Sequence, residues 1–384
     1  MVGKYERRNA LLDFFKQSTQ MAEADPNSIA YAQNLVQGTT ISSERYDRQG
    51  VYNSVTFGQP PHQVQVIFLD TRWARQDHCI PSIGTTRIPL GNVIACVTRW
   101  ITAGLLPSTF GAGGATNRPA APTCLNNSVL DDMQWTWLEE QLQQSKAQVH
   151  VIVSSIQVLT TNPVVESWGH FPKERMRLLS LLSHLEGSVI LLSGDVHHGE
   201  ILKAYGTNRG QEAADTFSTE GGLLEVTSSG LTHSCSEPFY GPLCAPILET
   251  FSDHRYTRGP GDKGYFTGRN FGTIEIDWGG KITSDSTEND AVPSSMKVNV
   301  HDHWGNIVLS TGSHSLSQYS SRMSEMAIQN IPNCIDGHLI PFLSKSLGVI
   351  IWIVLIQIYR MYCREDSKYT VQGAKKKVRT EMIT

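Results

Sequence analysis

The sequence predicts an α/β protein in which an α/β half is followed by a β-rich half, so that two β-sheets pack together. Amphipathic segments alternate with short apolar segments between residues 131 and 193, which is typical of a layered α/β sheet. Beyond residue 200 the segments are mostly β-forming, which favours a second packed sheet over one doubly wound sheet. Several of the strands end in polar clusters, as strands do at the ligand-binding edge of an α/β sheet.

Helices are expected where apolar residues recur on one face. These segments are 8–17, 131–144 and 172–186. Two acidic residues begin the segment 131–144, which favours a helix through its macrodipole. Pro172 lies in the first turn of the segment 172–186 and Gly187 follows its end, and both are typical of helix boundaries.

Strands are expected where β-forming residues alternate or form short apolar runs. In the first half of the chain these segments are 51–57, 64–69, 148–155 and 189–193. In the second half they are 201–205, 223–228, 271–278, 296–300 and 306–310. The first two are separated by a turn and are predicted to pair as a hairpin. Residues 1–310 are interpreted as one domain, interrupted by a Gly-, Ala- and Pro-rich surface insertion at 77–128.

Composition and charge narrow the function classes. With 40% hydrophobic and 18% charged residues, the chain is ordinary for a globular protein. The formal net charge is −4 and no basic run lies outside the C-terminus, so we expect no nucleic-acid partner. The seven cysteines form no CxxC pair, which argues against a zinc ribbon or a thioredoxin-like centre.

Two features would be relevant in an oxidising compartment. Cys235 and Cys244 flank a short Pro- and Gly-containing loop, and they are either a disulfide pair or two free thiols. Asn126 begins a single glycosylation sequon, a triplet that is common by chance.

The C-terminal part of the chain has the pattern of a membrane anchor. Residues 347–359 are apolar almost throughout, so a transmembrane helix is predicted at 339–362; the alternative is a buried C-terminal helix. A serine-rich stalk is predicted at 311–338 and a basic tail at 363–384. The positive-inside rule places that tail in the cytosol and the domain of this single-pass protein in a lumen or outside the cell.

The segment 189–200 is a buried strand that ends in one acid and two imidazoles. Such groups either hydrogen-bond one another as a structural corner or bind a ligand, because unpaired polar atoms in a core are costly. Asp195 and His197 offer an oxygen and an imidazole nitrogen, which are suitable ligands for a metal ion. Arg72 and Arg75 follow another strand and are suited either to bidentate phosphate contacts or to surface ion pairs.

Several segments, in order, resemble the PhoD-like metallophosphoesterases of the alkaline phosphatase D type. They are GVYNSVTFG at 50–58, FLDTR at 68–72, WTWLEEQL at 135–142, VHVIVSSIQ at 149–157, WGHFPKER at 168–175, LSGDVHHGE at 192–200, TSSGLTH at 227–233 and RNFG at 269–272. The resemblance implies a calcineurin-like four-layer α/β/β/α sandwich, incomplete at its N-terminus, that hydrolyses small phosphate esters through a metal-activated water. The implied cofactors are divalent or trivalent metal ions, namely Fe, Ca, Zn, Mn or Mg.

Carried over by position, the resemblance implies Asp195 and His197 as metal ligands. The residues that it implies as catalytic or phosphate-binding are Arg72, His198 and His233. Glu200 is expected to orient a histidine rather than to bind metal, and Asp70 is expected to act in the same indirect way.

The chain departs from the family pattern at its start. Residues 4–15 resemble the stretch that follows the family's acidic metal motifs, and those motifs themselves are not in the sequence. Residues 1–9 show no signal peptide either, so the hypothesis is that the chain lacks its natural N-terminus and the first strands of its sheet. The leading interpretation is a membrane-anchored phosphatase. The alternatives are an inactive membrane-tethered binding or regulatory relative, and a phosphodiesterase that uses the same centre.

Overall fold

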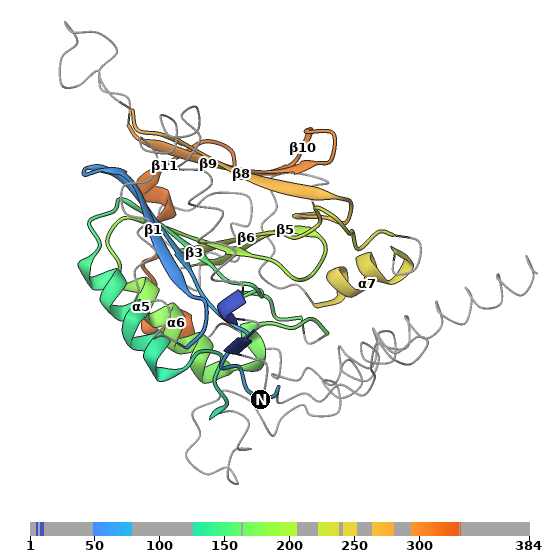
Figure 1. The fold of residues 1–384 in the computed structure, drawn as a ribbon. Coiled ribbons are helices and arrows are strands. Elements are labelled where there is room, and N and C mark those ends of the chain that lie inside the picture. The colour runs from blue at the N-terminus through green and yellow to red at the C-terminus, as the bar shows by residue number, and fades with distance from the viewer. Residues whose placement is uncertain are drawn as a thin grey trace, which may run out of the picture.

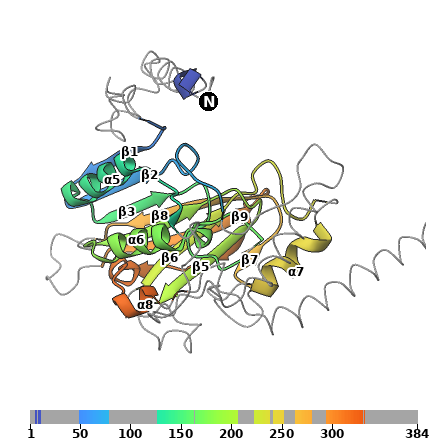
Figure 2. The same cartoon turned by 90° about the horizontal axis from the view of Figure 1, so that it is seen from below.

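The computed structural model describes residues 5–6, 8–10, 49–78, 126–162, 164–205, 222–237, 241–251, 263–279, 293–329 and 331. These residues form two stacked β-sheets, with helices on the outer face of the larger one (Figure 1). In the perpendicular view, helices α5 and α6 lie in front of the larger sheet, and strands of the smaller sheet lie behind it (Figure 2).

The larger sheet has seven strands in the order β1-β2-β3-β4-β6-β5-β7. Their bounds are β1 Asn53–Gln59, β2 His62–Phe68, β3 Val149–Val153, β4 Ser188–Ser193, β5 Gly199–Tyr205, β6 Gly222–Ser228 and β7 Tyr265–Phe266. Strands β2, β3, β4 and β6 run parallel, whereas β1, β5 and β7 pair antiparallel with their neighbours. The carboxyl ends of the four parallel strands therefore meet at one edge of the sheet, where α/β proteins bind ligands.

The smaller sheet has four strands, and β9 lies at its centre. Their bounds are β8 Asn270–Asp277, β9 Ser295–Asp302, β10 Ile307–Ser310 and β11 His314–Ser315. All pairings of β9 are antiparallel. The inward residues of β9 are Met296, Val298 and Val300, and they pack against apolar residues of β3, β4 and β6 in one buried cluster. This cluster holds the two sheets together through apolar surface removed from water.

Besides the helical residues 5–6 and 8–10, four α-helices are described with their bounds: α5 Asp132–Gln144, α6 Pro172–Ser183, α7 Gly241–Phe251 and α8 Glu325–Gln329. Helix α5 begins where the Asp131 side chain accepts a hydrogen bond from the Gln134 backbone N–H, and it buries Trp135, Leu138 and Leu142. Helix α6 has Pro172 in its first turn. Both helices contribute to the buried cluster on the outer face of the larger sheet. The predictions of helices at 131–144 and 172–186 and of a hairpin at 51–69 are confirmed.

The resemblance implied a four-layer sandwich. The described residues form three layers: helices, the larger sheet and the smaller sheet. On β8 the residues that face away from the larger sheet include Thr273, Glu275 and Asp277, which are polar and not buried. An antiparallel sheet tolerates such a solvated face. No helix among the described ranges supplies a fourth layer over this face.

The prediction of a transmembrane helix as part of the fold is not supported by the structure. Within the ranges that the structure describes, no helix is long and apolar enough to cross a membrane. The longest described helix, α5, has 13 residues, whereas a spanning helix needs about 20. The predicted span at 339–362 and the basic tail at 363–384 lie outside the described residues. The predicted lumenal or extracellular placement and the predicted membrane partner depended on that span, so both predictions are withdrawn with it.

The serine-rich region predicted as a stalk is packed on the domain over residues 314–329. It contains β11, the 3-10 helix η5 (Leu316–Tyr319) and α8. The Tyr319 hydroxyl donates to the Met296 carbonyl oxygen at 2.9 Å, and Ile328 joins the buried cluster beneath α6. Apolar residues spaced among the serines therefore give this segment a buried face. Two other predicted segments lie largely outside the described residues, namely the opening helix and the insertion at 77–128.

Lys203 of β5 provides a pH-dependent test of the packing between the sheets. It is 2% exposed, and its side chain lies on the same face of β5 as Ile201, toward the smaller sheet. Burial lowers the pKa of its ammonium group to about 8. The unfolded chain therefore binds more protons than the folded chain between pH 8 and the ordinary lysine pKa of about 10.4, so stability rises with pH in that window.

We expect Lys203→Met to raise the free energy of unfolding at pH 7 by on the order of 2 kcal/mol, because no charge then has to be desolvated. The variant should also lose the rise in stability above pH 8. Urea denaturation at pH 7, 8.5 and 10 measures both effects. The matched control is Lys263→Met at an exposed position, and equal pH profiles for the Lys203 variant and the unaltered chain would show that the prediction is wrong.

Candidate active site

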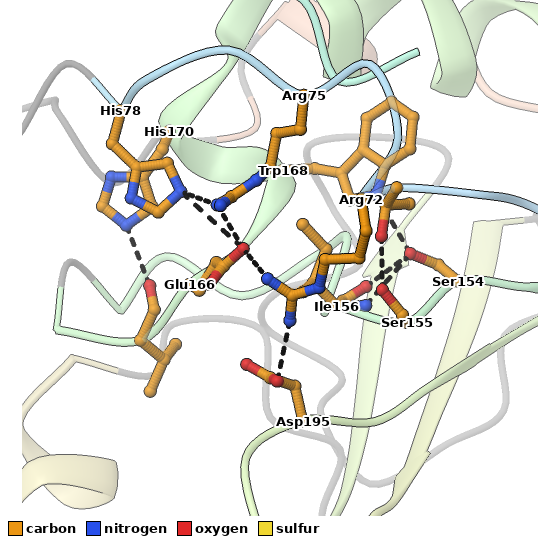
Figure 3. Close-up of polar contacts among 12 residues, drawn as sticks. Arg72, Arg75, His78, Ser154, Ser155, Ile156, Glu166, Trp168, His170 and Asp195 are labelled. Carbon is orange, nitrogen blue, oxygen red and sulfur yellow. Dashed lines mark hydrogen bonds and ion pairs between the residues drawn. The ribbon is translucent and has the colours of Figure 1, made fainter. Parts of the chain in front are cut away.

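Polar segments follow the parallel strands at the carboxyl edge of the larger sheet. Asp70 to Arg72 follow β2, Ser154 to Gln157 follow β3, Gly194 to His198 follow β4, and Ser229 to His233 follow β6. Strands β2 and β6 flank β3 and β4 in the sheet, so the four segments converge. Figure 3 shows that Arg72 and Asp195, which come from two of these segments, point toward each other.

Asp70 anchors the turn that carries Arg72. One carboxylate oxygen, Oδ1, accepts hydrogen bonds from the backbone N–H groups of Arg72 and Trp73, each at 2.9 Å. The other, Oδ2, accepts from the Val51 N–H at 2.9 Å. The backbone of Asp70 exchanges two further hydrogen bonds with the Gln134 amide. Asp70 therefore fixes the direction in which the chain leaves β2.

Arg72 lies between two carboxylates. Its Nη1 donates to Glu166 Oε1 at 2.5 Å, and its Nη2 donates to Asp195 Oδ1 at 2.8 Å (Figure 3). Partial burial by itself would lower the pKa of the guanidinium, but the hydrogen bonds and negative charges of Glu166 and Asp195 outweigh burial and raise the pKa. Arg75 Nη1 also contacts Glu166 Oε1 and lies 2.8 Å from His78 Nε2. The guanidinium of Arg72 is thus fixed in place while its side chain stays 44% exposed.

The loop after β4 holds Asp195 and His197 in the left-handed backbone region, with φ of 76° and 58°. This conformation is uncommon for residues other than glycine, and such strain is typically found at functional sites. Neighbouring backbone and side-chain groups hold it: the His197 N–H donates to Ser229 Oγ at 3.0 Å, and its carbonyl oxygen accepts from the Cys235 N–H at 2.7 Å. Both side chains of this loop remain exposed at the site.

His198 lies on the inner side of the same loop and is 1% exposed. Its Nε2 lies 3.3 Å from Glu200 Oε2, which also accepts from Gln157 Nε2 at 2.9 Å. Gln157 donates to Thr227 Oγ1 as well, at 2.9 Å. The structure therefore places His198 in a buried polar network beneath the exposed side chains of Asp195 and His197. Glu200 thus contacts His198, and its predicted role of orienting a histidine at the site stays a prediction.

His233 is exposed and lies close to His197, with 5.8 Å between the ring centroids. Two residues further on, Cys235 forms a disulfide bond with Cys244 at a Cα–Cα distance of 5.9 Å. Cys244 belongs to α7, so this bond ties the loop that carries His233 to that helix. Asn126 is exposed, and its side-chain oxygen accepts a hydrogen bond from Lys173; its glycosylation stays a prediction.

A family model described as PhoD-like phosphatase matches residues 30–285, which is more than half of the chain. The chain belongs to the PhoD-like phosphatase family. Among solved structures, a structure of PhoD is similar to it, with 15% sequence identity and a TM-score of 0.35 over 79% of this chain and 53% of that one. The chain thus spans about half the length of that protein. No curated protein matches the sequence.

PhoD-like phosphatases are metal-dependent phosphoesterases in general. Catalytic zinc sites have three protein ligands, and calcium takes six or more oxygen ligands. In the described part of this chain, no group of three or more His, Cys, Asp or Glu side chains is placed to hold a metal ion. The carboxylate of Asp195, one of the two predicted ligands, is also ion-paired with the Arg72 guanidinium. The described residues of this PhoD-like domain therefore do not form a complete metal centre.

Two acidic residues near the candidate site, Glu166 and Glu225, were not predicted from the sequence. Glu166 follows no strand and belongs to no predicted motif. The signal that could have found it is that Arg72 and Arg75, which lie close together in the sequence, need a negative partner. Glu225 of β6 is fully buried and accepts hydrogen bonds from the backbone N–H groups of Val158 and Leu159, at 2.8 and 2.6 Å. Burial raises the pKa of its carboxyl group. It reads as a strand residue in the sequence, and only its contacts show that it supports the segment after Gln157.

Proposed function

We propose that this chain binds and hydrolyses small phosphate esters as a PhoD-like phosphoesterase. The observation that carries the proposal is the family match over residues 30–285. The geometry of the site supports it: exposed cationic and imidazole groups from different strand ends lie at the edge of the sheet where ligands gather.

Each exposed side chain has a role in this proposal. Arg72 binds the phosphoryl oxygens, because a guanidinium offers two parallel N–H donors that match a phosphate. His233 contributes a further nitrogen to phosphate binding from the loop after β6. The buried His198, held by Glu200, keeps the loop after β4 in shape and does not contact the substrate. We assign these roles to the chain's own side chains and no step to a metal ion.

Asp195 and His197 are the two metal ligands that we propose for this chain, and the metal is one of Fe, Ca, Zn, Mn or Mg. We expect Asp195→Asn to weaken Mn²⁺ binding by at least about tenfold, because a carboxylate oxygen becomes a neutral amide. Titration calorimetry of the metal alone measures this effect without relying on turnover. Asp277→Asn, at an exposed end of β8, is the matched control. Equal metal affinities for both variants and the unaltered chain would contradict the assignment.

The enzymatic proposal is tested with p-nitrophenyl phosphate and with bis-p-nitrophenyl phosphate, each assayed with and without added divalent metal. We expect metal-stimulated release of p-nitrophenol from at least one of the two esters. The preferred ester distinguishes a monoesterase from a diesterase. No turnover of either ester with any of Mn²⁺, Ca²⁺, Zn²⁺, Mg²⁺ or Fe ions would show that the chain is not a phosphatase as it stands.

The second candidate function is a binding or regulatory domain without catalytic activity. Two observations favour it: no set of three metal-ligating side chains is assembled within the described residues, and Arg72 already neutralises Asp195. Binding of inorganic phosphate without turnover, measured on the same protein sample, would support this candidate over the enzyme.

A further inference from the structure

Glu166 and its two arginine contacts are the part of the site that the family resemblance did not indicate. We propose that Glu166 is a positioning residue that holds the guanidinium groups of Arg72 and Arg75 together for a phosphate group. The proposal rests on the proposed function and deepens it, because it names the group that organises phosphate binding.

The backbone around Glu166 is held on both sides. The Val165 carbonyl oxygen lies 2.8 Å from His170 Nε2, and Ser167 forms a parallel β-bridge with Gln157. Trp168 is fully buried, and its indole N–H donates to Ser154 Oγ at 3.1 Å. The Glu166 side chain therefore projects from a segment anchored in the core, and it reaches the site in a defined direction (Figure 3).

A single carboxylate oxygen, Glu166 Oε1, contacts both guanidinium groups, through Nη1 of Arg72 and Nη1 of Arg75. Two guanidinium groups repel each other, and a carboxylate between them compensates this repulsion. The Glu166 side chain is 16% exposed, against 44% for Arg72 and 26% for Arg75. The carboxylate is thus the more buried partner, and it lies between the two guanidinium groups, which are more exposed to solvent (Figure 3).

The contact of Arg72 with Asp195 is the one that a phosphate can replace. Both of its side chains are well exposed, at 44% and 38%, and an exposed ion pair contributes little to stability. The contact with Glu166 involves the less exposed acid and a different nitrogen of the same guanidinium. A phosphate can therefore take the place of Asp195 at Nη2 while Glu166 keeps Nη1 in position.

Glu166→Gln distinguishes positioning from a purely electrostatic role, because the two predict opposite signs. Removing a negative charge beside an anion site should tighten phosphate binding if charge alone matters. If Glu166 positions the arginines, its loss lets them separate and phosphate binding weakens. We expect the dissociation constant of inorganic phosphate to rise about tenfold, since small misplacements of binding groups have effects of this size or larger.

The experiment measures phosphate binding by calorimetry on the full chain, and KM and kcat on any ester that is turned over. We expect Glu166→Gln to raise KM more than it lowers kcat, and Glu166→Asp to recover part of the affinity because it restores the charge. The control is Glu139→Gln, which breaks the exposed ion pair between Glu139 and Arg177 on the helical face and should leave phosphate binding unchanged.

The outcomes separate this inference from the proposed function. Phosphate binding by Glu166→Gln that equals or exceeds that of the unaltered chain, with its thermal midpoint retained, overturns the positioning role and leaves the proposed function standing. An unaltered chain that binds no phosphate and hydrolyses no ester overturns the proposed function, and the inference with it.

Discussion

Replacing Arg72 by alanine is expected to lower kcat/KM for a phosphate ester by about 100- to 1,000-fold, the effect of removing one well-placed donor to a developing negative charge. Arg72 is the cation that the structure holds at the carboxyl ends of β2 and β4, through contacts with Glu166 and Asp195. Initial-rate measurements with p-nitrophenyl phosphate test the effect. If the chain binds phosphate without turnover, the dissociation constant of phosphate is measured instead.

Two further variants sharpen the Arg72 prediction. Arg72→Lys keeps the charge but loses the planar pair of donors, so an intermediate loss is expected. Arg177→Ala removes an arginine of helix α6 whose guanidinium lies over the Trp135 ring and pairs with Glu139, and not with any of the site residues. This control should retain kcat/KM. A loss of less than about tenfold in Arg72→Ala would remove Arg72 from the phosphate site.

Asp70→Ala is expected to lower the free energy of unfolding by about 3–5 kcal/mol, because three backbone N–H groups lose a charged acceptor in a buried position. Those donors are the N–H groups of Val51, Arg72 and Trp73. Asp70 is only 7% exposed, so water cannot readily replace it. Urea denaturation followed by tryptophan fluorescence measures the loss, and phosphate binding should weaken with it because the turn before Arg72 is released.

Asp302 offers a matched control for Asp70. Its carboxylate also accepts backbone hydrogen bonds in a turn, from the N–H groups of Trp304 and Asn306, each at 2.9 Å. Because that turn is exposed to water, Asp302→Ala should destabilise the chain far less than Asp70→Ala. Similar losses for the two variants would show that burial does not set the cost, and that Asp70 has no special structural role.

Much of the fold was set by local patterns in the sequence. Helix α5 was predictable because Asp131 caps its start and its apolar residues share one face. The strand before Asp195 was predictable from its short apolar run, and the polar groups at its end indicated a site. The order of motifs between residues 50 and 272 also indicated the PhoD-like phosphatase family, to which the matched model assigns the chain.

The arrangement within the site was decided by tertiary structure. Arg72 meets Glu166 across 94 residues and Asp195 across 123 residues, so no local pattern records either ion pair. The sequence predicted both His197 and His198 at the site. Adjacent residues on a tight loop can point to different sides: in the structure His197 is exposed, whereas His198 is buried and contacts Glu200. The segment 314–329 lies within residues 311–338, which were predicted as a stalk because they are rich in serine. Tyr319 and Ile328 are buried against the two sheets and α6, which are formed by residues far away in the sequence. Composition alone cannot predict such long-range burial.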